Sequence, residues 1–291
     1  MKPNIKSIKD IARIITMFLL SIFISCQPDE LGEGNGLIAG DLDASFTISK
    51  VTDSNNNTYL FTADNQKYIG SSWNITDSDG TSIGGANEVF IPDAGTYNVQ
   101  HKVTGIGGEA DIVTKTLVVE ASDPIAGNIV RGGKFNNADN IAEWTVLNIS
   151  ASGIEWAFAD GKATIEGGNW NQKAIYQAID VIEGNIYKID MLVSSTSGVQ
   201  NTWFEVFASP TIPVDGSDYS AGGAKAKFST WGGCGTEPFN WLLTVGGCDF
   251  NGEQGKFVAT ATETIYLVIK CGGEDLRDGV SVDNVEMRVS N

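Results

Sequence analysis

The stretch Glu155-Trp-Ala-Phe-Ala-Asp160-Gly161-Lys-Ala-Thr-Ile165 indicates the fold most clearly. Its two arms, Glu155 to Phe158 and Lys162 to Ile165, have strand-like composition. Asp160-Gly161 between them suits a tight hairpin turn, because Asp and Gly readily adopt the backbone conformation that the centre of such a turn needs. Similar runs lie on both sides of the hairpin, and about ten of them predict a jelly-roll β-sandwich over residues 125–291.

Residues 37–122 carry a second set of short runs in which apolar and polar residues alternate. Ala44 to Ile48 and Tyr97 to Val103 are examples, and turn-rich segments separate them. This spacing is typical of a small β-sandwich. With Ala121-Ser-Asp-Pro124 as a linker, the sequence predicts an all-β chain of two sandwiches.

The first residues have the pattern of an export signal. Four basic residues and one acidic residue precede an apolar stretch from Ile14 to Ile24. This stretch is shorter than a membrane span and suits the hydrophobic region of a signal peptide. It ends in Phe23-Ile24-Ser25-Cys26, which resembles the loose lipobox of Bacteroidetes lipoproteins. The resemblance implies removal of residues 1–25 and a lipid on Cys26 that anchors the chain to the outer membrane, facing the cell exterior. The alternative is an ordinary secretory signal and an incidental cysteine.

Acidic residues outnumber basic ones in the rest of the chain. The net charge is −17, and removal of residues 1–25, with their four basic residues and one acidic residue, makes it −20. This charge disfavours nucleic acid, anionic lipid headgroups and acidic polysaccharides as partners, whereas a neutral ligand carries no such penalty. Residues 26–36 are acidic and Gly-rich and cannot bury apolar area, so we expect a flexible tether there.

Three cysteines follow Cys26 in the sequence, namely Cys234, Cys248 and Cys271. In an oxidising cell envelope we expect one disulfide and one free cysteine. Cys234 and Cys248 are the favoured pair, because both lie in one Gly-rich segment without a long strand between them. A disulfide to Cys271 is an open alternative. The spacing contains no Cys-x-x-Cys metal motif.

The two sandwiches resemble known families. Trp73-Asn-Ile-Thr-Asp-Ser-Asp-Gly80 and the run Val89 to Val99 resemble a PKD domain, a spacer or protein-contact module. The resemblance implies an immunoglobulin-like sandwich over residues 37–122 in which Trp73 and Tyr97 are core residues. In the second sandwich, an ordered set of motifs resembles carbohydrate-binding modules of the family 4/9 type. The set consists of Ile129-Val-Arg-Gly-Gly-Lys-Phe135-Asn, Trp144, Asp160 to Ile165, Gly168-Asn-Trp170, Ile175-Tyr-Gln177, Gly184-Asn-Ile-Tyr187 and Gly279 to Val285. With the lipobox, this arrangement resembles SusE/SusF-type surface glycan-binding lipoproteins of Bacteroidetes, which implies a SusC/SusD-like importer as partner.

Exposed tryptophans are the first candidates for binding sugar. Sugars present apolar CH faces and hydroxyl groups, so proteins hold them with aromatic rings and planar polar side chains. Trp170 lies in the polar run Gly167 to Gln172, where we expect a loop. Trp231 and Trp241 flank a Gly-rich loop that a disulfide between Cys234 and Cys248 would stiffen. We predict that Trp170, Trp231 and Trp241 form a sugar-binding platform. The alternative for each is packing beneath its own loop.

The run Thr202 to Ala208 supplies further candidates because its side chains alternate between two faces. Phe204, Val206 and Ala208 suit a core, so Trp203, Glu205 and Phe207 are expected on the face that forms the groove in the resembling modules. The residues predicted to bind sugar hydroxyls are Glu205, Gln177 and Tyr219. Trp144 is expected in the core, and Trp156 suits either core or surface.

The same resemblance implies a structural calcium ion. The resembling modules often hold calcium between their first and last strands through carbonyl and carboxylate oxygens, which calcium prefers. In this chain the corresponding residues are Asn136 and Asp283. Asn136 stands where those modules usually carry glutamate, which removes one charge.

We therefore expect a non-catalytic surface protein that captures a neutral polysaccharide. Hydrolysis of a glycosidic bond usually needs two carboxylates at a defined separation, and no hydrolase motif supplies them. His101 has no nucleophile partner in its sequence context and is expected at a strand end. Because family 4-type modules frequently bind β-glucans, β-1,3-glucan of the laminarin kind is the first expectation, followed by mixed-linkage glucan and xylan. A structural or adhesive surface protein and a jelly-roll lyase or hydrolase are the alternatives.

Overall fold

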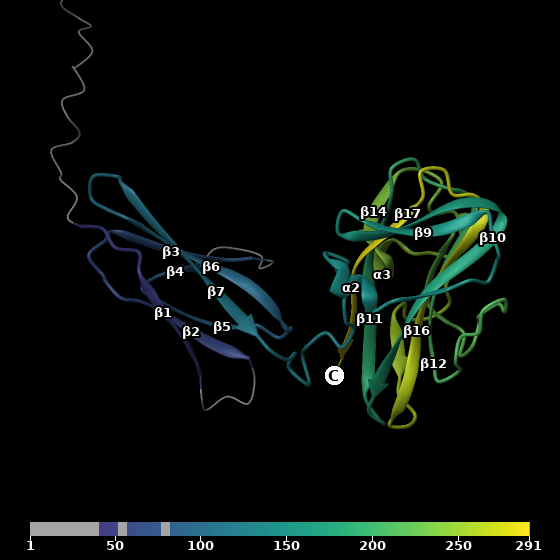
Figure 1. Cartoon of the computed structure of the whole chain (residues 1–291), viewed down its shortest axis with the longest axis horizontal. Helices are drawn as coiled ribbons and strands as arrows, with labels where there is room; N and C mark the ends of the chain where they lie inside the picture. Colours follow the sequence, from purple (N-terminus) through teal and green to yellow (C-terminus); the bar gives the residue numbers. More distant parts are fainter. Residues whose placement is uncertain (1–40, 52–56, 77–81, 291) are drawn as a thin grey trace, which may run out of the picture. The chain divides into compact units, whose positions relative to one another are not determined.

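The computed structural model describes residues 41–51, 57–76 and 82–290 (Figure 1). The predicted signal peptide, the predicted lipidation site Cys26 and the tether lie outside the described residues. Within the described part of the chain, no helix is long and apolar enough to cross a membrane. The chain divides into two compact units, one made mainly of residues before Val118 and one made mainly of residues from Val118 onward.

The first unit is an immunoglobulin-like sandwich of two sheets. One sheet has the order β1-β2-β5 and the other the order β4-β3-β6-β7. In β6, Val99 and Val103 are buried whereas Gln100 and Lys102 are exposed, which is the alternation expected of a strand with one face on a core. The strands are β1 (Phe46–Lys50), β2 (Thr58–Ala63), β3 (Gly70–Ile75), β4 (Ser82–Ile83), β5 (Ala86–Phe90), β6 (Gly95–Thr104) and β7 (Ala110–Val119).

His101 lies inside β6 and is fully buried, so the expectation of a strand-end residue is wrong. Its ring stacks on that of Trp73, with 3.9 Å between the ring centroids. Its Nδ1 lies 2.9 Å from the carbonyl oxygen of Ala44, and its Nε2 lies 2.8 Å from the hydroxyl of Ser71. Burial is tolerated because both ring nitrogens have hydrogen-bond partners. Trp73 is a core residue as predicted, whereas Tyr97 is only half-buried.

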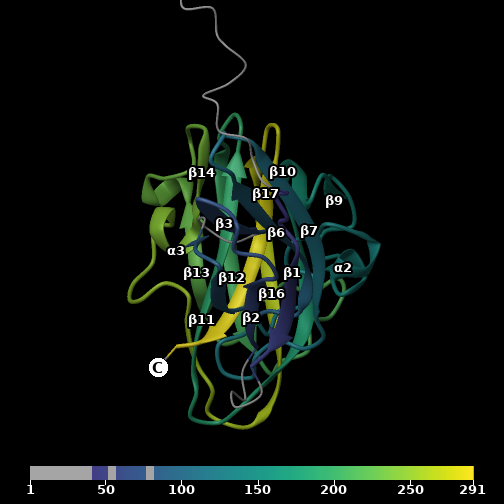
Figure 2. The ribbon, with the colours of Figure 1, turned by 90° about the vertical axis from the view of Figure 1, so that its left-hand side faces the viewer.

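The second unit is a jelly-roll β-sandwich, which confirms the predicted all-β fold class. Its strands follow the order β13-β12-β16-β10-β17-β11-β14, with β8 and β9 paired to β10 and β15 paired to β11. Figure 2 shows its short helices α2 and α3 on opposite flanks of the sheets. The elements are α2 (Ala138–Ala142), β8 (Thr145–Leu147), β9 (Ile154–Ala159), β10 (Lys162–Val181), β11 (Ile186–Ser195), β12 (Gln200–Ser209), β13 (Ala224–Ser229), η1 (Thr230–Gly232), β14 (Phe239–Leu242), α3 (Leu243–Gly246), β15 (Lys256–Val258), β16 (Glu263–Asp275) and β17 (Val280–Val289).

The long strand β10 turns a corner and so belongs to both layers of the sandwich. Its first part pairs with β9 and β17, and its second part pairs with β16 and β8. The register shifts between Gly168 and Asn171. Gly167 and Gly168 have φ angles of 124° and 158°, and a Cβ on either would lie within 2.3 Å of a carbonyl oxygen. The corner therefore needs these glycines, and it projects Trp170 from a strand rather than from the loop expected there.

The predicted hairpin is confirmed. β9 pairs antiparallel with β10, and Asp160 and Gly161 between them have φ angles of 52° and 72°. Trp144 and Trp156 are both buried, and the indole N–H of Trp144 donates a hydrogen bond of 3.1 Å to the carbonyl of Gly132. Phe204, Val206 and Ala208 are also buried in the core between the layers, as predicted.

Candidate glycan-binding site

Three tryptophans from separate segments meet at one end of the layer that contains β12 and β16. Trp203 lies on β12, Trp170 at the corner of β10 and Trp231 in the 3-10 helix η1. The ring centroid of Trp231 lies 6.3 Å from that of Trp203 and 6.3 Å from that of Trp170, with angles between ring planes of 28° and 26°. Trp170 is 56% exposed, Trp231 is 58% exposed and Trp203 is partly exposed. We call these three residues the tryptophan cluster.

A glycine on β16 makes room for the cluster. Gly272 is the register partner of Trp203 on β12 and of Gln172 on β10. A Cβ on Gly272 would lie 2.8 Å from Cζ2 of Trp203 and 2.6 Å from Cβ of Gln172. The indole of Trp203 therefore lies against the backbone of β16, which only glycine permits at this position.

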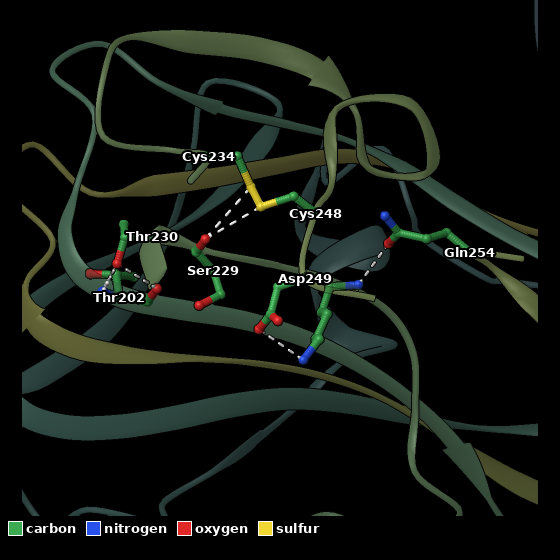
Figure 3. Close-up of a disulfide and its surroundings, with 8 residues drawn as sticks. Thr202, Ser229, Thr230, Cys234, Cys248, Asp249 and Gln254 are labelled. Atoms are coloured by element: carbon green, nitrogen blue, oxygen red, sulfur yellow. Dashed lines mark hydrogen bonds and ion pairs between the residues drawn. A yellow bond between two sulfur atoms is a disulfide. The ribbon is translucent and has the colours of Figure 1, made fainter. Parts of the chain in front are cut away.

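Hydrogen bonds on both sides of Trp231 hold it in place. The hydroxyl of Thr230 accepts a hydrogen bond of 2.9 Å from the N–H of Thr202 and lies 3.3 Å from the carbonyl oxygen of the same residue (Figure 3). This ties η1 to the residue before Trp203. On the other side, the N–H of Gly233, whose φ is 93°, donates to the carbonyl of Thr230. Trp231 is thus placed before any ligand arrives, which lowers the entropy lost on binding.

A disulfide between Cys234 and Cys248 closes the loop behind η1 (Figure 3). This is the pairing favoured from the sequence, and Cys271 is a buried free cysteine. The carbonyl oxygen of Ser229 lies 3.3 Å from Sγ of Cys248, and a Cβ on Gly232 would lie 3.0 Å from the same sulfur. The bridge therefore packs directly against η1. Burial raises the pKa of the Cys271 thiol well above its ordinary value, so this cysteine is a core residue of low reactivity.

Gln172 is a site residue that sequence reasoning missed. It lies across Gly272 from Trp203 and on the same face of the layer, because the three residues are in register. Its backbone exchanges hydrogen bonds of 3.0 Å with Ser150. Within the described residues its side-chain amide has no hydrogen-bond partner, and a planar amide beside an aromatic ring can both donate to and accept from sugar hydroxyls. Only the pairing of β10, β16 and β12 reveals this position.

Glu205 lies on the same face, two residues along β12 from Trp203. Its carboxylate lies 3.1 Å from Nζ of Lys270, which also contacts the carboxylate of Asp218 at 3.0 Å and the carbonyl of Tyr219 at 2.9 Å. The Lys270 side chain is nearly fully buried, whereas that of Glu205 is partly exposed. Neutralising a buried ammonium is therefore the role that the structure gives Glu205, and its carboxylate still reaches the surface next to the cluster.

Gln177 and Tyr219 are buried and lie outside the cluster. The Gln177 amide accepts from the N–H of Arg131 at 3.0 Å and donates to the carbonyl of Arg131 at 2.9 Å. The Tyr219 hydroxyl donates to the carbonyl of Thr211 at 2.8 Å, and burial raises the pKa of this hydroxyl. The Tyr219 ring packs edge-to-face on Phe207, so Phe207 is covered instead of lining an open groove. All three side chains serve the fold.

Trp241 does not join the cluster either. Its ring stacks on Phe239 with 4.3 Å between centroids, and a Cβ on Gly246 would lie 2.1 Å from its Cγ. It packs against the main hydrophobic core, and its indole N–H is buried without a hydrogen-bond partner in the described residues. Pairing of β14 with β11, in which Trp241 opposes Val193, directs the ring beneath its own loop. This is the alternative that the sequence left open.

The residues predicted to hold calcium fit that ion poorly. The carboxylate of Asp283 accepts the backbone N–H of Asn284 at 2.6 Å. Burial raises the pKa of the Asp283 carboxyl, while the charges of Lys134 and Lys162 partly offset this effect. Calcium takes about six to eight oxygen ligands and favours several carboxylates. Asn136 and the single carboxylate of Asp283, which lies near the charges of Lys134 and Lys162, supply little of such a ligand set. Among the described residues there is also no group of three His, Cys, Asp or Glu side chains that could hold a metal.

We expect the thermal unfolding midpoint of the chain to be the same in calcium chloride and in EDTA, because the lysines near Asp283 disfavour a divalent cation. Differential scanning calorimetry in the two buffers measures this. Magnesium chloride at equal ionic strength controls for general salt effects. A rise of several degrees in calcium alone would instead support the ion that the family resemblance implies.

Substitution of Gly272 by alanine should lower both stability and glycan affinity. The new Cβ would push Trp203 and Gln172 apart, and overpacking of this kind typically costs about 1–3 kcal/mol. Urea unfolding and affinity electrophoresis on the same variant measure the two effects. Gly70→Ala is a matched control, because its Cβ would meet only ordinary contacts at 3.7 Å or more. Unchanged affinity in Gly272→Ala would show that Trp203 is not placed by this contact.

Comparison with known proteins gives matches only among solved structures. No protein-family model matches the chain, and no curated protein matches it. A structure described as carbohydrate-binding modules of the β-sandwich superfamily has 15% sequence identity and a TM-score of 0.32, covering 84% of this chain and 97% of its own. A family 4 carbohydrate-binding module has 16% identity and a TM-score of 0.31, covering 55% and 99%. An enzymatically active domain of a bacteriophage CBA120 tailspike protein has 12% identity and a TM-score of 0.32, covering 60% and 23%.

Proposed function

We propose that this protein binds a polysaccharide at the tryptophan cluster and does not cleave it. The observation that carries the proposal is the meeting of three indoles from β10, β12 and η1, two of them more than half exposed. Exposing indoles to water is unfavourable unless a partner covers them, and fixed aromatic rings bind sugar faces at small entropic cost. The neighbouring amide of Gln172 supplies a donor and an acceptor for hydroxyl groups.

The ligand that best fits this site is neutral. The chain carries a net charge of −20 after removal of residues 1–25, which repels polyanions. Next to the cluster, Lys270 is paired with the two carboxylates of Glu205 and Asp218, so this group keeps an excess of negative charge and disfavours an acidic sugar. Among neutral glycans, β-1,3-glucan of the laminarin kind is our first choice from the family resemblance, with mixed-linkage glucan and xylan next.

We further propose that the protein acts on the cell surface. The lipobox-like sequence at Cys26 supports a lipid anchor in the outer membrane, and the acidic segment after it supports a tether. The immunoglobulin-like unit, through its resemblance to a PKD domain, would serve as a spacer, and a SusC/SusD-like importer would receive the glycan. Protease treatment of whole cells tests the orientation: the chain should be digested on intact cells, and full protection would contradict a surface location.

Affinity gel electrophoresis tests the function itself. Native gels containing laminarin, mixed-linkage β-glucan, xylan or alginate are compared with a gel without polysaccharide. We expect retardation in laminarin and none in alginate, which is anionic. Retardation only in alginate, or in none of the gels, would contradict the proposal. Detection of reducing sugars after incubation with each polysaccharide should show no release, and release of reducing ends would indicate a hydrolase or lyase.

A further inference from the structure

The outward face of the β12–β16 layer is open at only one end. Trp203, Glu205 and Phe207 alternate with core residues along β12 and therefore point away from the core between the layers. Trp203 and Glu205 are partly exposed, but Phe207 is 2% exposed. On β16, Val268 is the register partner of Phe207 and is fully buried as well. Other residues must therefore cover the far end of this face.

The cover is the segment between β12 and β13, residues 210–223. Its Tyr219 lies edge-to-face on Phe207, with 5.8 Å between ring centroids. Its Asp215 accepts the N–H of Asn148 at 2.9 Å, which ties it to the segment after β8. Together these residues build a second, smaller hydrophobic core outside the sandwich. Its buried members are Leu147, Ala174, Phe207, Tyr219 and Val268.

The buried ammonium of Lys270 holds the covering segment in place next to the tryptophan cluster. Lys270 on β16 is the register partner of Glu205 on β12, and its ammonium contacts the carboxylate of Glu205. The same ammonium contacts the carboxylate of Asp218 and the carbonyl of Tyr219, both of which belong to the covering segment. Its ammonium also lies 5.0 Å from the ring centroid of Phe207. Removing one partner from such a buried pair is costly, so the segment is held in place rather than resting loosely on the sheet.

We infer that the cluster binds a short stretch of glycan, about three sugar rings, and that the rest of the chain leaves the sheet instead of running on over β12 and β16. This inference rests on the proposed function. The three indoles follow one another in two steps of 6.3 Å, which gives each of about three rings one aromatic partner. Beyond them lie the ion pair of Glu205 and Lys270 and then the covering Tyr219, and the next aromatic rings on this face, Tyr176 and Tyr266, are half-buried against the small outer core. Additional sugar rings would meet solvent.

Isothermal titration of the full chain with laminari-oligosaccharides of two to six glucose units tests this length limit. We expect affinity to rise severalfold from dimer to trimer and by less than about twofold from trimer to hexamer. A continued severalfold rise with each unit up to the hexamer would overturn the length limit while leaving the proposed function intact. A protein that binds none of the oligosaccharides and is retarded in none of the polysaccharide gels would overturn both.

A variant pair tests whether the covering segment sets the limit. Tyr219→Ala removes the ring that covers Phe207, so the hexamer should gain affinity relative to the trimer. Tyr219→Phe is the matched control, because it keeps the ring and loses only the hydrogen bond to Thr211. An unchanged hexamer-to-trimer ratio in a folded Tyr219→Ala protein would overturn the role of the segment. If Tyr219→Ala does not fold, the length series on the unchanged protein decides the inference alone.

Discussion

Replacement of Trp231 by alanine should lower the affinity for laminarin at least about thirtyfold, the equivalent of about 2 kcal/mol. Trp231 is the central member of the tryptophan cluster, and its ring lies next to those of both Trp170 and Trp203. The substitution removes one binding surface and leaves the other two indoles without their common neighbour. Isothermal titration measures the loss, and circular dichroism verifies that the fold is kept.

Trp241→Phe is the matched control for this prediction. Trp241 flanks the same disulfide loop in the sequence, but it packs on Phe239 and the core. A phenylalanine keeps much of that stacking and removes an indole N–H that has no partner in the described residues. Its affinity for laminarin should equal that of the unchanged protein. The account would be contradicted if Trp231→Ala bound normally while Trp241→Phe lost binding.

Removal of the Cys234–Cys248 disulfide should have the second large effect. The bridge joins residues 14 apart in sequence, and a closed loop of about 15 residues contributes about 3 kcal/mol to stability in the chain-entropy description. For a domain of this size, that loss lowers the unfolding midpoint by about 6–12 °C. Calorimetry of the Cys234→Ser, Cys248→Ser double variant measures it. Glycan affinity should fall as well, because η1 would then have to be ordered on binding.

The control for this experiment is Cys271→Ala, which removes a buried thiol and keeps the disulfide. It should lower stability moderately and leave glycan affinity unchanged, since Cys271 points into the core between the layers. An unfolding midpoint in the double variant equal to that of the unchanged protein would show that the bridge does not restrain the loop.

The sequence predicted those parts of the fold that depend on local pattern. Asp160-Gly161 formed the expected hairpin because the turn chemistry is contained in the two residues. Phe204, Val206 and Ala208 faced the core because strand alternation is a local property. His101 shows the limit of such patterns: its burial depends on Ala44 and Ser71, which come from other segments and satisfy its ring nitrogens.

The candidate site could be predicted only in part for the same reason. Composition and position in the sequence indicate Trp170, Trp203 and Trp231, but their meeting depends on the corner of β10 and on the pairing of β12 with β16. Trp241, which the sequence predicts in the platform, packs against the core, whereas Gln172, which the sequence does not indicate, lies beside the cluster. Nothing local distinguishes Trp241 from Trp231, yet β14 pairs with β11 and turns Trp241 inward, whereas Gln172 is brought beside the cluster by a register that the sequence does not display.

The most direct test of the account uses the indole N–H signals of the protein's tryptophans in a 15N-labelled sample. Single Trp→Phe variants assign the seven signals, and laminarin is then titrated into the unchanged protein. We predict that the signals of Trp170, Trp203 and Trp231 shift together and saturably, while those of Trp73, Trp144, Trp156 and Trp241 stay in place. Saturable binding that shifts only signals outside the cluster would contradict the central claim.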